Sequence, residues 1–435
     1  MADAELLSRM RSDWNERARE DANYYVAFGR KQQDDDEFLS TAADVVRALK
    51  AELRRLPGET PVRARRALEI GCGPGRLMLP LSKCFGEIHG IDVSDEMVAK
   101  ARDRLRHIPH LHVHCSSGAD LAGFADESFD FVYSYAVFQH IPSEEVVFQY
   151  LREVRRVLKV GGILHCQING LPKTAKHYDT WSGARIGAEQ VSRFAREQDF
   201  QLLALEGALT QYTWTTWRKR PAGWALALGQ QTPPGTSKIR AIGNCHTGEP
   251  MAPASGRFAS ISLWLEDLPP DFDLNHVEVR VDGLAATPTY IGPPQPEGLC
   301  QFNVILPQAC RTGILRVEAG WLGKALCTPG WVRIIPAPPD VPRVLSVTDG
   351  VDLLAGRRIV SRSVKLVIEE VTSPEQLTVA VDGVPVRDLD VFCTDPFNLR
   401  HEMNFTLPEA IGSGPHSLKL EFGRSNSILI PIEVV

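Results

Sequence analysis

The sequence lacks a long apolar segment, an excess of positive charge and any pairing pattern among its cysteines. No apolar run approaches the ~18 residues that a membrane-spanning helix needs. The longest candidate, residues 223–229 (GWALALG), is far too short. The net charge of -6 argues against a general nucleic-acid binder, because phosphate binding favours a basic surface. We therefore expect no membrane span and no nucleic-acid partner.

The nine cysteines are scattered along the chain, and no Cys-x-x-Cys pair occurs among them. This distribution favours reduced thiols over a disulfide framework or a zinc site. The first fifteen residues are polar and of mixed charge, and they lack the apolar core of a secretory signal. We expect a cytoplasmic protein.

The residue pattern changes near residue 232, which predicts a domain boundary there. Before it, apolar runs alternate with helical periodicity; after it, short β-branched runs are separated by Pro and Gly. Residues 230–237 (QQTPPGTS) form a plausible linker, and the Pro-rich residues 335–342 divide the remainder. The predicted domains are 1–232, 236–336 and 340–435.

The first domain shows strands alternating with helices. We predict strands over 64–70, 87–92, 111–115, 129–134 and 163–168, helices over 77–85, 95–105, 144–158 and 188–198, and final segments over 200–205 and 211–217. Such alternation predicts an α/β fold with a mostly parallel sheet covered on both faces. Ligands of these sheets bind at the carboxyl ends of the strands.

The remaining two domains resemble one another in sequence. Residues 277–284 (VEVRVDGL) recur as 377–384 (LTVAVDGV), and 302–307 (FNVILP) recur as 403–408 (MNFTLP). A period near 100 residues, with alternating strands and an Asp-Gly turn, predicts two tandem all-β sandwiches of immunoglobulin size.

A glycine-rich turn follows the first predicted strand, in residues 67–76 (ALEIGCGPGR). Gly71, Gly73 and Gly75 have no Cβ atoms and allow a backbone to approach a ligand closely. A phosphate-binding loop would need a Lys that is absent, and a dinucleotide fingerprint would need Gly where Arg76 stands. The alternative is a strand-to-helix turn that binds no ligand.

Asp92 stands at the end of the second predicted strand. A carboxylate in this position can accept hydrogen bonds from both hydroxyls of a ribose. The alternative is an acid that only stabilises a helix N-terminus.

Five motifs in register resemble class I S-adenosylmethionine-dependent methyltransferases of the small-molecule kind (methyltransferase 11 and 25 families). They are residues 68–75 (LEIGCGPG), 89–94 (HGIDVS), 128–132 (SFDFV), 139–142 (QHIP) and 156–162 (RVLKVGG). The resemblance covers roughly residues 10–218 and implies a doubly wound, seven-stranded Rossmann-like methyltransferase domain.

The resemblance also implies the contacts of the cofactor, S-adenosylmethionine. Glu69, Gly71 and Gly73 would surround its methionine part, with Gly75 in the same cofactor-binding turn. Asp92 would bind the ribose, and Val93 and Met97 would flank the adenine.

The adenine end departs from the family pattern, which usually has an Asp where this chain has Gly118. The backbone of Gly118 and Ala119 would still read the base. Asp120 either replaces the missing side chain or does not contact the adenine.

Tyr135 and His140 follow the fourth strand, where similar enzymes have their reaction pocket. His140 is a candidate general base, since its ordinary pKa lies near neutrality. Alternatively, it only packs before the helix that starts at Ser143.

Near the start of the chain, Trp14, Tyr24 and Tyr25 interrupt a polar, helix-like segment. Similar enzymes use such a segment as a lid over cofactor and acceptor, and aromatic faces suit a sulfonium cation. Alternatively, these rings only anchor a helix.

His112 and His114 alternate on the third strand. With no third ligand type beside them in the sequence, we expect no metal site.

The two sandwiches resemble immunoglobulin-like repeats related to TIG domains, on residues such as 279–284 and 298–304. Their expected role is to bind a protein partner, a glycan or another copy of the chain. We expect methyl transfer to O, N or C of a small or medium-sized acceptor, which includes glycan- or lipid-like molecules. A rival hypothesis is a non-catalytic scaffold that binds S-adenosylmethionine. A further alternative, a nucleotide-sugar or NAD-dependent enzyme, conflicts with Arg76 at the third glycine position.

Overall fold

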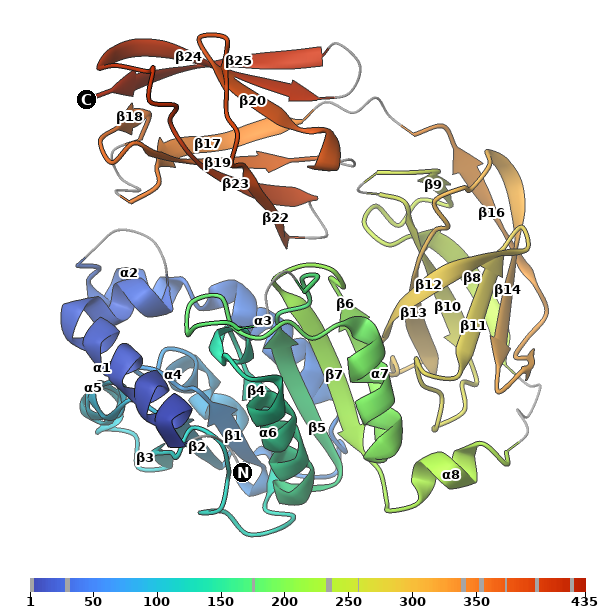
Figure 1. Cartoon of the computed structure of the whole chain (residues 1–435). Helices are drawn as coiled ribbons and strands as arrows, with labels where there is room; N and C mark the ends of the chain where they lie inside the picture. Colours follow the sequence, from blue (N-terminus) through green and yellow to red (C-terminus); the bar gives the residue numbers. More distant parts are fainter. Residues whose placement is uncertain are drawn as a thin grey trace. The chain divides into compact units, whose positions relative to one another are not determined.

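A computed structural model describes most of the chain (Figure 1). The described residues are 4–27, 32–173, 177–231, 237–256, 258–337, 342–351, 356–371, 374–395, 399–422 and 426–435. Within these ranges no helix is both long and apolar enough to cross a bilayer. The chain divides into two compact units. Unit 1 comprises Met1–Ile242, Ser262–Val304 and Val317–Gly330, and unit 2 comprises Gly243–Ile261, Ile305–Arg316 and Trp331–Val435.

Unit 1 contains a mixed sheet with the strand order β3-β2-β1-β4-β5-β7-β6. Its strands are β1 (Arg66–Ile70), β2 (Glu87–Asp92), β3 (Leu111–Cys115), β4 (Phe129–Ser134), β5 (Leu158–Ile168), β6 (Phe200–Glu206) and β7 (Thr213–Lys219). Strands β1 to β5 pair in parallel, and β7 runs antiparallel to both β5 and β6. The strand order reverses beside β1, which makes the carboxyl ends of β1 and β4 the expected ligand position.

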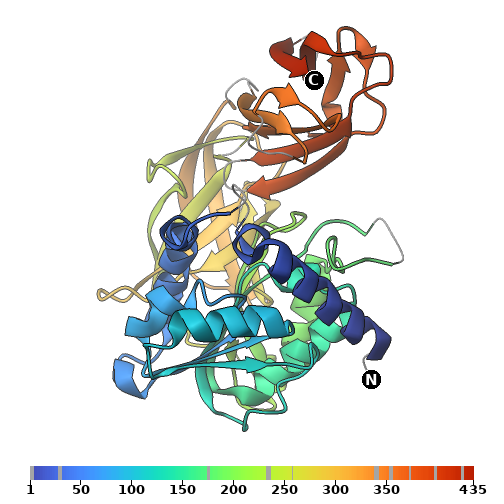
Figure 2. The ribbon, with the colours of Figure 1, turned by 90° about the vertical axis from the view of Figure 1, so that its left-hand side faces the viewer.

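Helices pack on both faces of this sheet, so the predicted α/β fold is confirmed. They are α1 (Ala4–Val26), α2 (Asp35–Ser40), α3 (Ala43–Glu52), α4 (Met78–Leu81), α5 (Asp95–Leu105), α6 (Glu144–Val157) and α7 (Ala188–Glu197). Side chains of α6 and α7 share one apolar core with β1, β4, β5 and β6. Helix α1 lies beside α5 (Figures 1 and 2).

Local sequence explains where these helices begin. Ser94 caps α5 by accepting from the amide of Met97, and Ser143 caps α6 in the same way from Val146. Each helix has two acidic residues in its first turn and arginines in its last, which suits the helix dipole. The amphipathic pattern of α6 buries one face against the sheet.

Two predicted elements differ from the structure. The helix predicted over 77–85 is only the short α4 and a 3-10 turn (Ser82–Cys84), since Pro80 interrupts the amide hydrogen bonds. Strand β5 starts at Leu158 rather than at 163. Gly161, at φ +86°, lies within this strand and does not end the helix before it.

Further strands follow along the chain. After the short α8 (Trp224–Leu228) and β8 (Lys238–Asn244) come β10 (Ser260–Glu266), β11 (Val277–Val281), β12 (Leu284–Ile291), β13 (Leu299–Ile305), β14 (Gly313–Trp321) and β15 (Lys324–Ala325). Strand β12 pairs antiparallel with β6 at Tyr290 and Ala204. The sheet of the first domain therefore extends into residues of the second predicted domain.

Unit 2 is all-β in the part described. Besides β9 (Met251–Pro253) and β16 (Gly330–Ile335), it contains β17 (Arg343–Asp349), β18 (Arg358–Ile359), β19 (Ser363–Glu369), β20 (Thr378–Val381), β21 (Val384–Pro385), β22 (Asp390–Asp395), β23 (Arg400–Thr406), β24 (Gly414–Phe422) and β25 (Asn426–Val434). The sheets β17-β19-β23-β22 and β18-β25-β24-β20-β21 bury their apolar faces in one common core. The predicted linkers at 230–237 and 335–342 lie partly outside the described residues.

Candidate functional site

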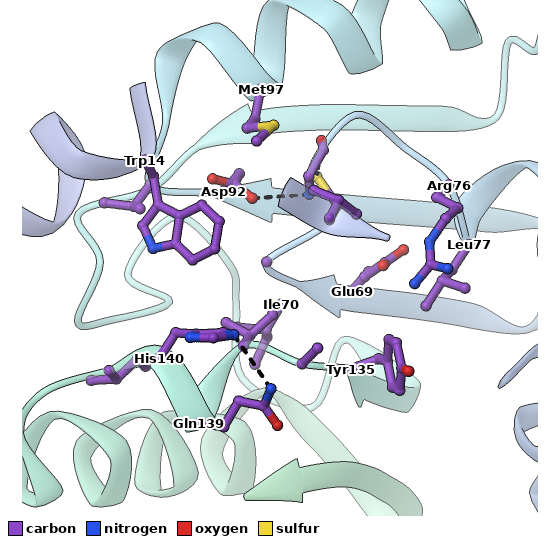
Figure 3. Close-up of a pocket in the computed structure, with 18 of the residues that line it drawn as sticks. Trp14, Glu69, Ile70, Arg76, Leu77, Asp92, Met97, Tyr135, Gln139 and His140 are labelled. Carbon is purple, nitrogen blue, oxygen red and sulfur yellow. Dashed lines mark hydrogen bonds between the residues drawn. The ribbon is translucent and has the colours of Figure 1, made fainter. Parts of the chain in front are cut away.

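A cavity of about 360 Å³ opens at the carboxyl ends of β1, β2 and β4 (Figure 3). Its size is within the range of small-molecule and cofactor sites. Of the predicted site residues, Glu69, Gly71, Gly73, Asp92, Val93, Met97, Gly118, Tyr135, His140 and Tyr25 line it. Gly75, Ala119 and Tyr24 are described in the structure but are not among the lining residues.

The glycine-rich turn forms one wall of the cavity. Gly71 and Gly73 have φ values of +70° and +51°, a region that side chains rarely occupy. A Cβ on Gly71 would lie 2.2 Å from Val137 Cγ2. Gly75 has a different role, because a Cβ there would lie 2.9 Å from Leu105 of α5. The first two glycines therefore shape the cavity, and the third allows α5 to pack against the turn.

Asp92 ends β2 with its carboxylate at the cavity wall. Its Oδ2 accepts from the amide of Gly73 and its Oδ1 from the amide of Ser94, each at 2.9 Å. Burial raises the pKa of Asp92 to about 6, and these amide hydrogen bonds oppose that rise. A carboxylate accepts about four hydrogen bonds, so both oxygens retain acceptor capacity for further donors.

Glu69 lies on β1 beside the turn and is 3% exposed. Tyr133 of β4 donates its hydroxyl to Glu69 Oε2 at 2.9 Å. Burial raises the pKa of Glu69 to about 8, while Tyr133 and Arg76 act in the opposite direction. A cation in the cavity would favour the charged form of this carboxyl group.

The wall beyond Asp92 is formed by Val93, Met97, Ser116 and Gly118. Gly118 has φ +89°, and a Cβ there would lie 3.0 Å from Val93 Cγ2, so glycine allows the close approach of this loop.

No aspartate side chain from positions 118 or 120 lies in this wall to contact the adenine. Position 118 has no side chain, and Asp120 is not a lining residue. Asp120 instead accepts from the hydroxyl of Ser117 at 2.9 Å and from the amide of Ala122 at 3.1 Å. Its carboxylate therefore stabilises its own loop.

Helix α1 contributes Met10, Trp14, Tyr25 and Val26 to the cavity. Two arginines fix the helix across the opening. Arg11 donates to the carbonyl of Ser116 at 2.8 Å, and Arg17 donates to the hydroxyl of Thr180 at 3.0 Å. Tyr24 stacks edge-on against Tyr25, with ring centroids 5.2 Å apart.

His140 borders the cavity below Trp14, and the two rings meet edge-on at 5.5 Å (Figure 3). Its Nδ1 lies 3.1 Å from the carbonyl oxygen of Trp181, which can only accept. The proton therefore resides on Nδ1, and Nε2 is an acceptor, 3.3 Å from the amide nitrogen of Gln139. Burial lowers the pKa of His140 to about 4, so the ring is neutral at pH 7.

Tyr135 forms the opposite side with Arg76. The Arg76 guanidinium lies 5.5 Å from the centre of the Tyr135 ring, and Tyr135 stacks on Trp214 at 5.6 Å. Arg76 is 4% exposed and donates to the hydroxyl of Thr41 at 2.9 Å.

Several lining residues have no signal in the sequence that predicts them. They are Thr41, Leu77, Ala136, Val137, Ile141, Tyr150 and Tyr212, with Met10, Val26 and Ala27 of the N-terminal region. Arg76 follows the glycine motif directly and could have been proposed from that position. Tyr212, by contrast, precedes β7 and reaches the cavity only through the folded sheet.

Part of unit 1 is similar to known proteins. Residues 68–166 match a family model described as a methyltransferase domain. A demethylmenaquinone methyltransferase of Staphylococcus haemolyticus is 32% identical over 104 residues, which cover 23% of this chain and 42% of that protein. A ubiquinone biosynthesis O-methyltransferase of Roseobacter denitrificans is 30% identical over 142 residues, which cover 32% of this chain and 54% of that protein. The chain spans about half the length of these relatives.

Among solved structures, a magnesium protoporphyrin IX methyltransferase from Synechocystis with bound SAH is similar. The sequence identity is 16%, the TM-score is 0.36, and the match covers 49% of this chain and 99% of that one.

Proposed function

We propose that this chain, in which residues 68–166 match a methyltransferase domain, transfers the methyl group of S-adenosylmethionine to a small-molecule acceptor. The observation that supports this most strongly is the cavity in which Asp92, Glu69 and the glycine-rich turn meet. Buried carboxylates suit the hydroxyl and ammonium donors of this cofactor, and the apolar wall suits its adenine.

In this proposal Asp92 accepts the two ribose hydroxyls. The amides of Gly73 and Ser94 already fix the orientation of its carboxylate, so ordering it on binding costs little. Val93 and Met97 flank the adenine, and backbone groups near Gly118 read its edge. Glu69 and the turn at 71–73 surround the methionine part.

Helix α1 acts as a lid in this proposal. Trp14 and Tyr25 line the cavity, and aromatic rings suit a sulfonium cation. Since Arg11 and Arg17 attach the helix to Ser116 and Thr180, the lid also excludes water from the reacting atoms.

We place the acceptor between Tyr135, Tyr212 and His140, which line the cavity. The sulfonium is already activated, so the protein's main task is in-line positioning. The acceptor nucleophile forms a bond to the methyl carbon, the bond from that carbon to sulfur breaks, and sulfur keeps the electron pair as a thioether.

His140 fits a positioning role better than that of a strong general base. Its pKa of about 4 makes it a weak base at pH 7, where the best general base has a pKa near the operating pH. Its Nε2 can still accept a hydrogen bond from an acceptor hydroxyl or amine and orient that group toward the methyl carbon.

For the β-rich parts we propose a binding role, as two immunoglobulin-like sandwiches in the domains 236–336 and 340–435. Trp331 and Ile314 are apolar side chains that are each 63% exposed, and they could contact a bound partner or another copy of the chain. Sedimentation of the full chain over a range of concentrations tests self-association. A monomer at every concentration would favour a different partner.

The test of the activity is transfer of an isotopically labelled methyl group to a pool of small molecules extracted from cells. The wild type is expected to give labelled products, and Asp92→Asn is expected to give much less of them when the cofactor concentration is limiting. Cofactor binding without transfer to any acceptor pool would instead indicate a non-catalytic scaffold.

A further inference from the structure

A cluster of histidines lies at the β2–β3 edge of the sheet, outside the cavity. Helices α4, α5 and α6 form the crossovers that follow β1, β2 and β4, but the connection from β3 to β4, residues 116–128, contains no helix. On the α6 side, Phe124 of this loop and Phe129 of β4 pack against His89. The ring of Phe124 lies 5.4 Å from that of His89 and 5.7 Å from that of His114.

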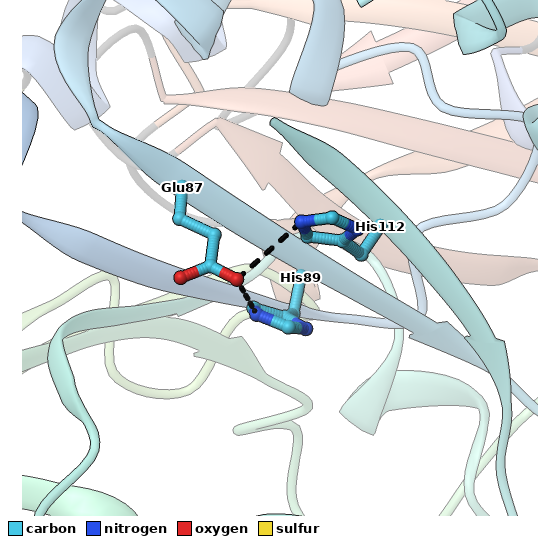
Figure 4. A group of neighbouring side chains, drawn as sticks. All are labelled: Glu87, His89 and His112. Atoms are coloured by element: carbon cyan, nitrogen blue, oxygen red, sulfur yellow. Dashed lines mark hydrogen bonds and ion pairs between the residues drawn. The ribbon is translucent and has the colours of Figure 1, made fainter. Parts of the chain in front are cut away.

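Three side chains converge in this part of the sheet (Figure 4). Glu87 and His89 are two positions apart in β2, so their side chains share one face of the sheet. The strand register places His112 of β3 beside His89. Oε1 of Glu87 lies 2.9 Å from Nε2 of His89 and 3.4 Å from Nε2 of His112. The three ligand atoms all lie within 4.8 Å of one another.

The three ligand atoms are close enough together to bind one metal ion. With bonds of about 2.0–2.2 Å to nitrogen and oxygen, two ligands of a tetrahedral ion are about 3.3–3.6 Å apart. Small side-chain rotations would bring Glu87 and His89 into that range. The His89 side chain is 11% exposed, while Glu87 and His112 are 33% and 41% exposed, so an ion could enter from solvent.

Neighbouring groups hold two of these side chains in place. Arg66 donates to the other carboxylate oxygen of Glu87, Oε2, at 2.7 Å, which leaves Oε1 available. Nδ1 of His89 lies 3.1 Å from Nε2 of His114. Hydrogen bonds from neighbouring residues to a metal ligand orient its carboxylate or imidazole toward the ion.

The protonation of His89 follows from its contact with Glu87. A carboxylate oxygen only accepts, so the 2.9 Å contact with Oε1 of Glu87 places a proton on Nε2 of His89 in the metal-free protein. A metal ion bound to both atoms would replace this proton, so binding is expected to release it.

We propose that Glu87, His89 and His112 bind a divalent first-row transition metal ion, for which Zn²⁺ is the best match. Two imidazoles and one carboxylate suit Zn²⁺ and its neighbours, whereas Mg²⁺ and Ca²⁺ prefer oxygen ligands only. Glu87 begins β2 and Asp92 ends it, so the ion lies away from the cavity. Three protein ligands leave the fourth position of a tetrahedral ion to water, and the bound ion would link the edge strand β3 to β2.

The test is calorimetric titration of the metal-free full-length protein with Zn²⁺. The wild type is expected to bind one ion, and Zn²⁺ is expected to raise its melting temperature. His114 contacts the ligand His89 and not the ion, so His114→Ala is expected to weaken binding by about 10- to 100-fold. His112→Ala removes a ligand and is expected to weaken binding by more than this. The exposed His107 gives a matched control, since His107→Ala should bind as the wild type does.

A second measurement distinguishes metal binding at this site from metal binding by cysteine thiolates. Bound Co²⁺ should give visible ligand-field bands without the near-ultraviolet charge-transfer band of a thiolate ligand. If His112→Ala fails to fold, as judged by circular dichroism, Glu87→Gln of nearly equal shape replaces it. A wild type without saturable binding, a thiolate band, or equal affinity in the folded variants would overturn the proposal.

Discussion

The amide of Gly73 donates to Oδ2 of Asp92 at 2.9 Å and so connects the glycine-rich turn to the end of β2. These residues are 19 positions apart in the sequence. The φ of +51° at Gly73 is unfavourable for a side chain, and this backbone conformation accompanies the contact. The turn and the carboxylate are therefore one preorganised unit, on which the first prediction depends.

Asp92→Asn should weaken S-adenosylhomocysteine binding. The amide keeps the shape of the side chain but replaces one acceptor with a donor and removes the charge. Hydrogen bonds to charged groups contribute about 1.5–3 kcal/mol, so we expect about 10- to 100-fold lower affinity. Calorimetry measures this loss. Asp103→Asn, at a carboxylate that is 78% exposed, is the matched control and should bind normally. Equal affinities for the two variants would contradict the role of Asp92.

Gly71→Ala should destabilise the fold and disturb the cavity together. Left-handed backbone costs a side chain about 1–2 kcal/mol, and the new Cβ would lie 2.2 Å from Val137. Overpacking of this kind adds about 1–3 kcal/mol. Urea unfolding measures the loss. Gly58→Ala is the control, since nothing lies within 4 Å of its added Cβ. A Gly71→Ala variant as stable as Gly58→Ala would refute the close contact.

The ligand-free protein should become less stable as pH rises from 4.5 to 8, in part because of Glu69. Its pKa is raised from 4.5 to about 8 in the folded state by burial. Within this window the folded state holds a proton that the unfolded state has released, so the free energy of unfolding falls with rising pH. Glu69→Gln should reduce this slope in urea unfolding at several pH values.

Glu206 requires its own control, because burial also raises its pKa to about 8. Glu206→Gln should reduce the slope additively, and the exposed Glu197→Gln should leave it unchanged. A Glu69→Gln protein with the pH dependence of the wild type would show that Glu69 is ionised throughout the window.

Arg55→Ala should destabilise unit 1 strongly. Arg55 Nε lies 2.6 Å from Oε2 of Glu52, and the two side chains are only 2% and 5% exposed. Removing one partner of a buried ion pair costs about 3–5 kcal/mol, because the other charge stays buried without its partner. Thermal unfolding measures this loss. The exposed Arg54→Ala is the control and should melt near the wild type. A comparable melting temperature for the two variants would contradict the prediction.

Much of the first domain was predictable because its helix caps and strands are encoded locally. Ser94 and Ser143 with their following acids predict the starts of α5 and α6, and both are confirmed. The predicted start of β5 is wrong because Gly161, which the pattern marks as the end of the preceding helix, lies inside the strand at φ +86°.

Contacts between distant segments could not be predicted from local patterns. The pairing of β12 with β6 at Tyr290 and Ala204 joins regions on either side of residue 232, where the residue pattern of the sequence changes. The contact of Glu87 with His112 depends on the register of β2 against β3, so the sequence showed only two histidines without a third ligand. Likewise, the sequence left open whether Asp120 contacts the adenine, because its hydrogen bond with Ser117 is seen only in the folded loop.

The most direct test of the central claim is calorimetric titration of the full chain with S-adenosylmethionine. Saturable binding of one equivalent by the wild type, and its loss when Asp92→Ala is combined with Gly73→Val, is the predicted result. A native protein that releases or absorbs no heat of binding, and shows no binding by equilibrium dialysis, would contradict the assignment of this cavity to the cofactor.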